Sequence, residues 1–130
     1  MELMRTMEWS EGRYRDSHLE LDLDRPSAWL DGRGMTLTRK EYELLSMLAQ
    51  NAGEIIPREV LLLQVWGYSR EIRTRTLDVH IRRLRKKLGA YGDLYIETIF
   101  GVGYRFRFQP YREYVPFQSY APALPVAVGF

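Results

Sequence analysis

The residues best suited to chemistry in this 130-residue sequence are basic and lie close together between Arg70 and Lys87. Eight of these eighteen residues are arginine or lysine and only Glu71 and Asp78 are acidic, which is a local balance of +6. The whole chain carries +2, so the remainder carries −4. Arginine offers paired N–H donors that match phosphate groups and the major-groove edge of guanine. This concentration of positive charge favours a polyanionic partner.

A helix would sort the basic segment into two faces. At 100° per residue, its leucines and isoleucine form one narrow stripe that would pack on a core. The stripe consists of Leu77, Ile81, Leu84 and Leu88. The other side carries polar and basic side chains around one valine, namely Arg75, Thr76, Val79, His80, Arg82, Arg83 and Lys86. Asp78 is placed to pair with Arg82, whereas the remaining charges have no partner on the helix.

Two interpretations of the basic face compete. Surface charges are usually solvated, but solvated helices normally mix signs and gain from pairs four residues apart. Val79 would instead suit a thymine methyl group, and the arginines would suit phosphates and bases. The pattern therefore favours nucleic-acid binding over a merely solvated face.

The composition narrows the chemistry further. The chain has no cysteine, which excludes disulfides, thiolate zinc sites and a cysteine nucleophile. The two histidines, His18 and His80, have no metal-ligand spacing to other side chains, and no residue set suggests catalysis. No apolar run approaches the ~20 residues that cross a bilayer, and no signal peptide is recognisable. We therefore expect no enzyme activity, no cofactor, no metal, no membrane contact and a cytoplasmic location.

Short strands precede the helical part of the sequence. The segment His18–Asp24 alternates apolar and polar residues, the period of a half-buried strand. Two further short strands, Ala28–Leu30 and Met35–Leu37, flank the turn residues Asp31–Gly34. These strands predict a small antiparallel sheet.

Two helices are expected before the basic one. Thr38 and Glu41 have the spacing of a capping box, and the helix that follows would end near Gly53. Pro57 would open a second helix that runs to about Trp66.

A hairpin and a tail complete the chain. The aromatic runs Tyr95–Phe100 and Tyr104–Phe108 are separated by Gly-Val-Gly, which predicts a β-hairpin. We assign residues 1–16 to a linker or arm, residues 17–108 to one domain and residues 109–130 to a proline-rich tail.

Several motifs in the sequence agree in order and spacing with the motifs of one family. These motifs are Leu37–Leu45 (LTRKEYELL), Val65–Gly67 (VWG), Arg75–Leu88 (RTLDVHIRRLRKKL) and Ile96–Phe106 (IETIFGVGYRF). Over about residues 18–108 the chain resembles the OmpR/PhoB-type winged-helix effector domains of two-component response regulators. The resemblance implies an α+β winged helix-turn-helix with an N-terminal antiparallel sheet of four strands, three helices and a C-terminal hairpin wing. The fourth strand would lie near Arg33–Leu37 or just after the first.

The resemblance also implies roles for individual residues. The third helix would read the major groove of double-stranded DNA, with Val79 and Arg83 at bases and Lys86 on the same face. Thr98 in the wing would contact a phosphate. Contacts to the sugar-phosphate backbone of DNA would come from Arg75, Thr76, His80 and Arg82.

Partners follow from the same resemblance. In the family, a loop before the third helix often contacts RNA polymerase, and here it would comprise Gly67, Tyr68, Ser69, Arg70, Glu71, Ile72, Arg73 and Thr74. Members bind direct repeats as head-to-tail pairs, usually after phosphorylation of a receiver domain. We expect a monomer alone and a head-to-tail pair on DNA.

Three features depart from the family pattern. No receiver domain is present in this sequence, and the proline-rich tail is additional. Many members have an arginine before the Gly-x-Gly of the wing, whereas this chain has Phe100. We expect Phe100 to fold back onto the hairpin or to contact a sugar, and to add little minor-groove selectivity.

Two functions remain open. The chain could be a sequence-specific DNA-binding transcription regulator, or a winged-helix module whose basic helix meets an acidic protein surface. The threonine and valine among the arginines favour DNA. The operator, the regulated genes and the direction of regulation are not encoded in any recognisable pattern.

Overall fold

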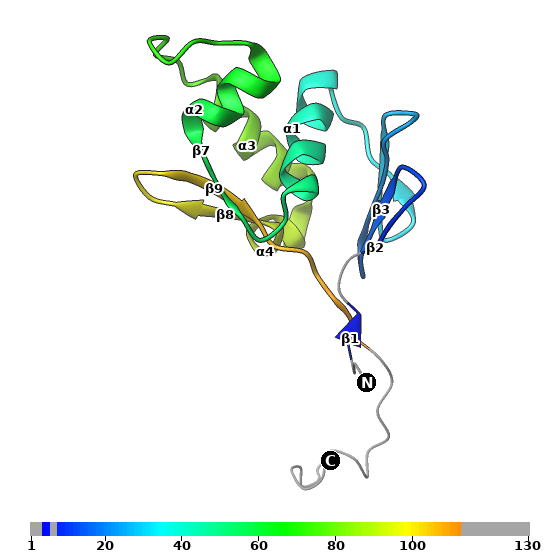
Figure 1. Ribbon diagram of the computed structural model, residues 1–130. Coiled ribbons are helices and arrows are strands. Elements are labelled where there is room, and N and C mark those ends of the chain that lie inside the picture. Colours follow the sequence, from blue (N-terminus) through cyan, green and yellow to red (C-terminus); the bar gives the residue numbers. More distant parts are fainter. Residues whose placement is uncertain (1–3, 6–7, 113–130) are drawn as a thin grey trace, which may run out of the picture.

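The computed structural model describes residues 4–5 and 8–112. The chain forms an N-terminal sheet, a group of helices and a C-terminal sheet whose first strand lies between the first two helices in the sequence (Figure 1). The N-terminal sheet holds β2 (Glu8–Ser10), β3 (Arg13–Arg15), β4 (Leu19–Asp22), β5 (Ser27–Leu30) and β6 (Arg33–Gly34). The helical elements are α1 (Arg39–Gln50), α2 (Arg58–Leu61), η1 (Leu62–Trp66), α3 (Thr76–Lys87), η2 (Gly89–Tyr91) and α4 (Gly92–Tyr95). The C-terminal sheet holds β7 (Ile55–Pro57), β8 (Ile96–Ile99) and β9 (Gly103–Phe106). The predicted α+β winged helix-turn-helix is confirmed.

The N-terminal sheet is antiparallel and has five strands in the order β2-β3-β4-β5-β6. Leu21 of β4 lies opposite Tyr14 of β3 on one side and Ala28 of β5 on the other, and all three side chains are buried. The alternation in His18–Asp24 therefore correctly predicted a strand with one face on the core.

The sheet extends into the segment assigned to a linker or arm. β2 pairs with β3, β3 pairs with β4, and the Tyr14 side chain is fully buried. Residues 8–15 thus belong to the sheet. β3 contains a single buried apolar position, Tyr14, which is too few to show a period of two.

The prediction of a strand at Met35–Leu37 was wrong. The pairing with β5 is made by β6, and only the backbone N–H of Met35 continues it, donating to the Ala28 carbonyl at 2.8 Å. The chain then leaves the sheet because Thr38 caps α1.

The capping box at the start of α1 is confirmed. The Thr38 hydroxyl accepts from the backbone N–H of Glu41, and the Glu41 carboxylate accepts from the backbone N–H of Thr38. The helix ends at Gln50, and Gly53 lies in the following turn with φ +90°, which glycine adopts without strain. Its N–H donates to the Phe106 carbonyl at 2.8 Å, which joins α1 to the C-terminal sheet.

The second helix begins after Pro57, as predicted, but changes form along its length. α2 continues directly into η1, a π-helical turn that ends at Gly67. Gly67 has φ +74° and closes the helix with a left-handed residue.

The stripe predicted for the third helix is confirmed. Leu77, Ile81, Leu84 and Leu88 are at most 1% exposed, and α3 packs against α1. The opposite side of α3 faces outward.

The predicted hairpin is confirmed and has a third strand that the sequence did not reveal. β7 pairs with β9, so the order in this sheet is β7-β9-β8. A Cβ on Gly103 would lie 2.0 Å from the Ile56 carbonyl oxygen, so only glycine permits this pairing. β7 is three residues long and ends in Pro57, which is too short for a recognisable strand pattern.

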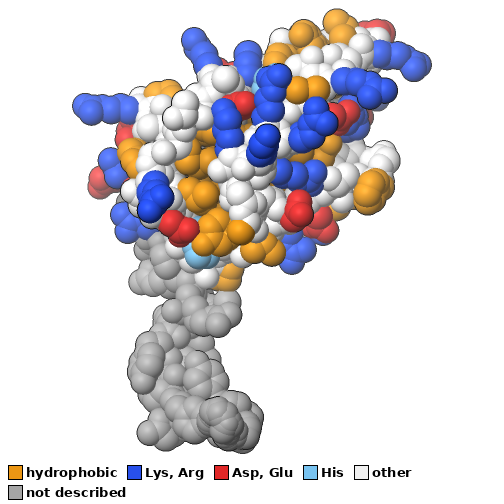
Figure 2. All heavy atoms as spheres, turned by 180° about the vertical axis from the view of Figure 1, so that it is seen from behind, with side chains coloured by type: hydrophobic (Ala, Val, Ile, Leu, Met, Phe, Trp, Pro, Cys, Tyr) orange, Lys and Arg blue, Asp and Glu red, His pale blue; other side chains and the backbone are white. Residues whose placement is uncertain are grey.

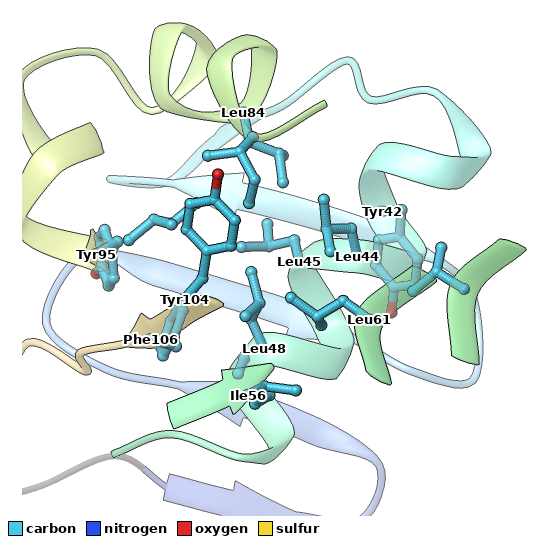
Figure 3. Close-up of a cluster of buried hydrophobic side chains, with 14 of the residues drawn as sticks. Tyr42, Leu44, Leu45, Leu48, Ile56, Leu61, Leu84, Tyr95, Tyr104 and Phe106 are labelled. Atoms are coloured by element: carbon cyan, nitrogen blue, oxygen red, sulfur yellow. The ribbon is translucent and has the colours of Figure 1, made fainter. Parts of the chain in front are cut away.

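One core joins the three parts. Leu44, Leu45 and Leu48 of α1 face Leu84 of α3 and the wing residue Phe106 (Figure 3). The Phe106 ring stacks on Tyr95 with centroids 5.3 Å apart and meets Tyr14 edge-on at 5.8 Å. The two sheets and α3 therefore hold fixed positions relative to one another.

Residues near the two ends of the described chain pair with each other. β10 (Tyr111–Arg112) pairs with β1 (Met4–Arg5), and the backbone N–H of Gln109 donates to Asp16 at 3.0 Å. The rest of the proline-rich tail, residues 113–130, lies outside the described residues. Within the described residues, no helix has the length and apolar character that crossing a membrane requires. No group of three or more potential metal-ligating side chains occurs among them either.

Candidate nucleic-acid interface

The outward side of α3 presents a cluster of cations. Arg75 precedes the helix, and Arg82, Arg83 and Lys86 follow within it, all with exposed side chains. Val79 is half-buried among them. Figure 2 shows Lys and Arg side chains gathered over the upper half of the face that is turned away in Figure 1.

The Thr74 side chain orders the first turn of α3, whereas the N-cap residue Arg75 makes no capping hydrogen bond with its side chain. The Thr74 hydroxyl lies 2.7 Å from the Thr76 hydroxyl and accepts from the Thr76 backbone N–H at 3.1 Å. Thr74 therefore satisfies one of the free N–H groups at the helix start.

His80 is held in one orientation. Its Nδ1 lies 2.8 Å from the Thr76 carbonyl oxygen, and its ring meets Trp66 edge-on with centroids 4.8 Å apart. A carbonyl oxygen only accepts, so Nδ1 carries the proton and donates. The Nε2 atom is left for a ligand.

The predicted pair between Asp78 and Arg82 is wrong. Asp78 instead accepts from Arg58 of α2 and from the hydroxyl of Tyr104 in β9, the latter at 2.9 Å. The hydrogen bond from Arg58 is the main reason that the pKa of Asp78 lies below its ordinary value. The same contact raises the pKa of Arg58.

Because Asp78 pairs with Arg58, the outward-facing cations of α3 have no acidic partner on their own helix. Arg82, Arg83 and Lys86 form no ion pair with any carboxylate in the described part of the chain. The one acidic side chain of α3 is neutralised by a different helix. The face is thus a region of net positive charge, which attracts a polyanion.

Two basic residues of α3 turn away from this face. Lys87 pairs with Glu41 at 2.6 Å. Arg85 donates to the Ile96 carbonyl and to the Thr98 hydroxyl, each at 2.7 Å from Nη2, and its guanidinium lies 5.9 Å from the centre of the Tyr104 ring. The role of Arg85 as a link to the wing was not predicted from the sequence. The place of Arg85 at about 80° from Leu77, beside the apolar stripe, was the available signal.

Thr98 is half-buried in β8 and accepts from Arg85. This contact occupies an acceptor position of the hydroxyl, so its hydrogen remains able to donate. Together with the contact of Asp78 to Tyr104, it connects both strands of the hairpin directly to α3.

The expectation that Phe100 folds back onto the hairpin was wrong. Its side chain is 91% exposed at the turn between β8 and β9. The turn is closed by the Val102 N–H, which donates to the Ile99 carbonyl at 3.0 Å, and Gly101 has φ +78°. The wing tip is therefore apolar and open.

The loop before α3 lies mostly in solvent. Tyr68 and Thr74 are half-buried, whereas residues 69–73 are exposed, including Ile72 at 46%. The Ile72 N–H donates to the Ser69 carbonyl at 3.1 Å, which gives the loop a turn. Gly67 to Thr74 thus form an accessible projection beside the start of α3.

Comparisons with known proteins agree with this geometry. The family model described as "Transcriptional regulatory protein, C terminal" matches residues 32–106. The chain is 43% identical over 90 residues to response regulator ArlR of Staphylococcus haemolyticus, which covers 68% of this chain and 41% of ArlR. The chain therefore spans less than half the length of this relative.

Solved structures show the same fold. The DNA-binding domain of RstA from Klebsiella pneumoniae, crystallised in complex with the RstA box, matches with a TM-score of 0.69 and 31% identity over 75% of this chain and 98% of RstA's. The response regulator DrrB of Thermotoga maritima, an OmpR/PhoB homolog, matches with a TM-score of 0.68 and 36% identity over 75% of this chain and 45% of DrrB. Motifs, fold and relatives agree, and the chain belongs to the OmpR/PhoB-type family of winged-helix DNA-binding domains of response regulators, a non-enzymatic family of transcription regulators.

Proposed function

We propose that this chain binds double-stranded DNA at specific sequences and acts as the DNA-binding part of a transcription regulator. The observation that carries the proposal is the uncompensated positive face of α3. Arg82, Arg83 and Lys86 form no ion pair among the described residues, and Asp78, the one acidic residue of α3, is paired with Arg58. The solved RstA domain, of similar fold, was crystallised with its DNA box.

In this proposal α3 lies in the major groove, as the second helix of helix-turn-helix modules does. Arg83 and Val79 meet base edges, and Lys86 lies on the same face. Phosphates are contacted by residues around them, namely Arg75, Thr76, His80, Arg82 and Thr98. The orientation of His80 supports its part, because Nδ1 is already bonded to Thr76 and only Nε2 can face DNA.

The rival function is an interaction module for an acidic protein surface. An acidic partner needs cations but not the half-buried Val79, and it would not need the fixed wing. A protein surface and a duplex also differ in the response to salt, since releasing counterions from DNA gives a steep, linear dependence.

We extend the proposal to a full-length response regulator that would contain this domain. In a full-length regulator, a receiver domain would control it, the exposed loop Gly67–Thr74 would contact RNA polymerase, and the protein would act in the cytoplasm. Two copies would bind a direct repeat head to tail, about 10–11 bp apart centre to centre, while the free domain is monomeric.

The test is selection of bound duplexes from a random DNA pool. Enrichment of a short motif by wild type, with the preference at one base position relaxed for Arg83→Ala, supports the proposal. A matched control is Arg39→Ala, which removes an arginine with 89% exposed side chain at the start of α1 and should return the same motif. Recovery of no motif, together with binding to polyacidic peptides, would support the rival. A footprint on inverted half-sites would contradict the head-to-tail arrangement.

A further inference from the structure

We propose that His80 contacts a DNA phosphate only as the positively charged imidazolium, so that DNA binding takes up a proton at this side chain. The inference rests on the proposed function, in which His80 is one of the residues that meet phosphates. It adds a dependence on pH to that site, and it follows from a hydrogen bond inside the protein.

The tautomer of the neutral ring is the first observation. Nδ1 of His80 lies 2.8 Å from the Thr76 carbonyl oxygen, which only accepts, so Nδ1 carries the proton. A neutral imidazole has a single N–H, and Nε2 therefore holds a lone pair. The oxygens of an ionised phosphate also only accept. The neutral side chain thus has no hydrogen bond to offer a phosphate, whereas the imidazolium donates from Nε2.

The second observation is that the ring is held from two sides. The Thr76 carbonyl lies one turn earlier on α3, and the Trp66 ring of η1 meets the imidazole edge-on with centroids 4.8 Å apart. His80 is half-buried in this position. A rotation that aimed the Nδ1 proton at DNA would break the hydrogen bond to Thr76. Adding a proton to Nε2 leaves both contacts intact.

The charged residues near His80 in the sequence form the third observation. On α3, Arg83 follows three residues later, and Asp78, two residues earlier, is paired with Arg58 of α2. The loop before α3 carries three exposed charged side chains, Arg70, Glu71 and Arg73. In the described part of the chain, no carboxylate forms an ion pair with His80.

The helices behind His80 add no acid either. Between Leu62 and Trp66, η1 has no ionisable side chain. From α1, the Lys40 ammonium donates to the Val65 carbonyl at 2.7 Å, and it is paired with Glu43 at 3.1 Å. The surroundings of His80 are therefore neutral or positive, and a DNA phosphate is the anion that the imidazolium would meet.

The place of His80 on the helix favours a phosphate over a base. At 100° per residue His80 lies about 60° from Leu77 in the apolar stripe, whereas Val79 lies about 160° away. A side chain at the flank of a helix in the major groove faces the sugar-phosphate wall, and the far side faces the bases. The alternative partner is an amino group of adenine or cytosine, which donates to a neutral Nε2. Acid would then weaken binding, so the two partners predict opposite effects of pH.

The test measures binding at about pH 5.5 and about pH 8, a range in which histidine is the side chain that ordinarily changes charge. The probes are the duplex selected from the random pool and an unrelated duplex of equal length. Acid should tighten binding of wild type to both duplexes by roughly 5- to 20-fold, because every sequence has phosphates. At the lower pH the slope of log K against log salt should be steeper by about one unit.

Three variants identify the group that takes up the proton. His80→Gln should bind equally at both pH values. His80→Arg carries a fixed charge, so it should also lose the pH dependence and should bind more tightly than wild type at pH 8. The matched control is His18→Gln, on the other histidine, which pairs with Asp31 and stacks on Tyr91. This control should keep the wild-type response to pH.

Calorimetry counts the protons directly, since the heat of binding in buffers of different ionisation enthalpy reveals uptake. Wild type and His18→Gln should take up protons on binding near neutral pH, and His80→Gln should not. This count on His18→Gln decides the question even if substitution of His80 destabilises the fold. No uptake by His18→Gln, or equal uptake by His80→Gln and wild type, overturns the inference and leaves the proposed function intact.

The sign of the pH effect is equally decisive. Weaker binding in acid that disappears with His80→Gln assigns Nε2 to a base donor and overturns the phosphate contact. Wild type that binds neither duplex at either pH rejects the proposed function itself.

Discussion

Lys87 Nζ at the end of α3 lies 2.6 Å from Glu41 Oε1 in the first turn of α1. The Glu41 side chain is only 2% exposed, and the same oxygen accepts from the Thr38 N–H at 2.9 Å. Burial alone would raise the pKa of Glu41, but the bonds from Lys87 and Thr38 outweigh it and leave the pKa lowered. One carboxylate thus caps α1 and fixes the end of α3 against it.

Replacing Glu41 by glutamine should lower the free energy of unfolding by about 1–3 kcal/mol at pH 7. Glutamine can still complete the capping box, so the loss reports the contact with Lys87. Because the folded pKa is depressed, the contribution is complete above the ordinary value of 4.5 and is lost as the pH falls through the folded pKa. Urea unfolding of both proteins should therefore show a difference that shrinks in acid. Glu43→Gln, on a carboxylate with a 33% exposed side chain, is the control and should cost less. A difference that persists undiminished at pH 3 would contradict this account.

Asp16 should be the most sensitive polar position in the N-terminal sheet. Its buried carboxylate accepts from His18 N, Leu19 N, Gln109 N and the hydroxyls of Tyr14 and Tyr95. Asp16→Asn places an amide donor against one or more of these donors and should cost about 2–3 kcal/mol in chemical unfolding. Asp93→Asn, at a side chain that is 98% exposed, serves as the control. Similar costs for the two substitutions would show that the network contributes little.

Arg82 and Arg83 are neighbours with different expected roles. Arg83→Ala should lose about 1–3 kcal/mol on the selected site and relax the preference at one base position. Arg82→Ala should weaken binding to all sequences about equally, because phosphates carry no sequence information. Binding titrations on a panel of single-base variants distinguish the two patterns. If neither substitution alters base preference, Arg83 is not a base reader.

Binding should depend steeply on salt. For ~4–6 phosphates neutralised per copy, the plot of log K against log salt should have a slope of roughly −4 to −5. Arg82→Ala should make this slope shallower by about one unit, whereas Arg39→Ala should not change it. A flat titration from low to physiological salt would contradict DNA binding through this face.

The C-terminal boundary of the folded unit should lie after Gln109. The backbone of Gln109 donates to Asp16 and accepts from Ser17, each at 3.0 Å, and its side chain donates to the Leu94 carbonyl at 3.1 Å. A chain that ends at Arg112 should retain the melting temperature of the whole protein. A chain that ends at Phe108 should melt lower by about 4–8 °C for each kcal/mol lost. Equal melting of both truncated chains would place the boundary at Phe108 or earlier.

Local patterns in the sequence determined much of this fold. The stripe Leu77–Ile81–Leu84–Leu88 predicted which side of α3 is buried, because helical period alone sorts these positions. The capping box at Thr38 predicted the start of α1 for the same reason, since both partners lie within one turn. The charge of the segment Arg70–Lys87 and its motifs indicated the family and its ligand.

Only the tertiary structure decided which charges face outward. Asp78 has Arg82 within reach on its own helix, yet packing brings Arg58 from α2 and Tyr104 from the wing to it. Arg85 looks like its neighbours in sequence, but its place beside the apolar stripe directs it to the wing. Phe100 is exposed at a turn that is closed by the bond from Val102 to Ile99. The partners of Asp78 and Arg85 lie far from them along the chain, and local periodicity does not identify them.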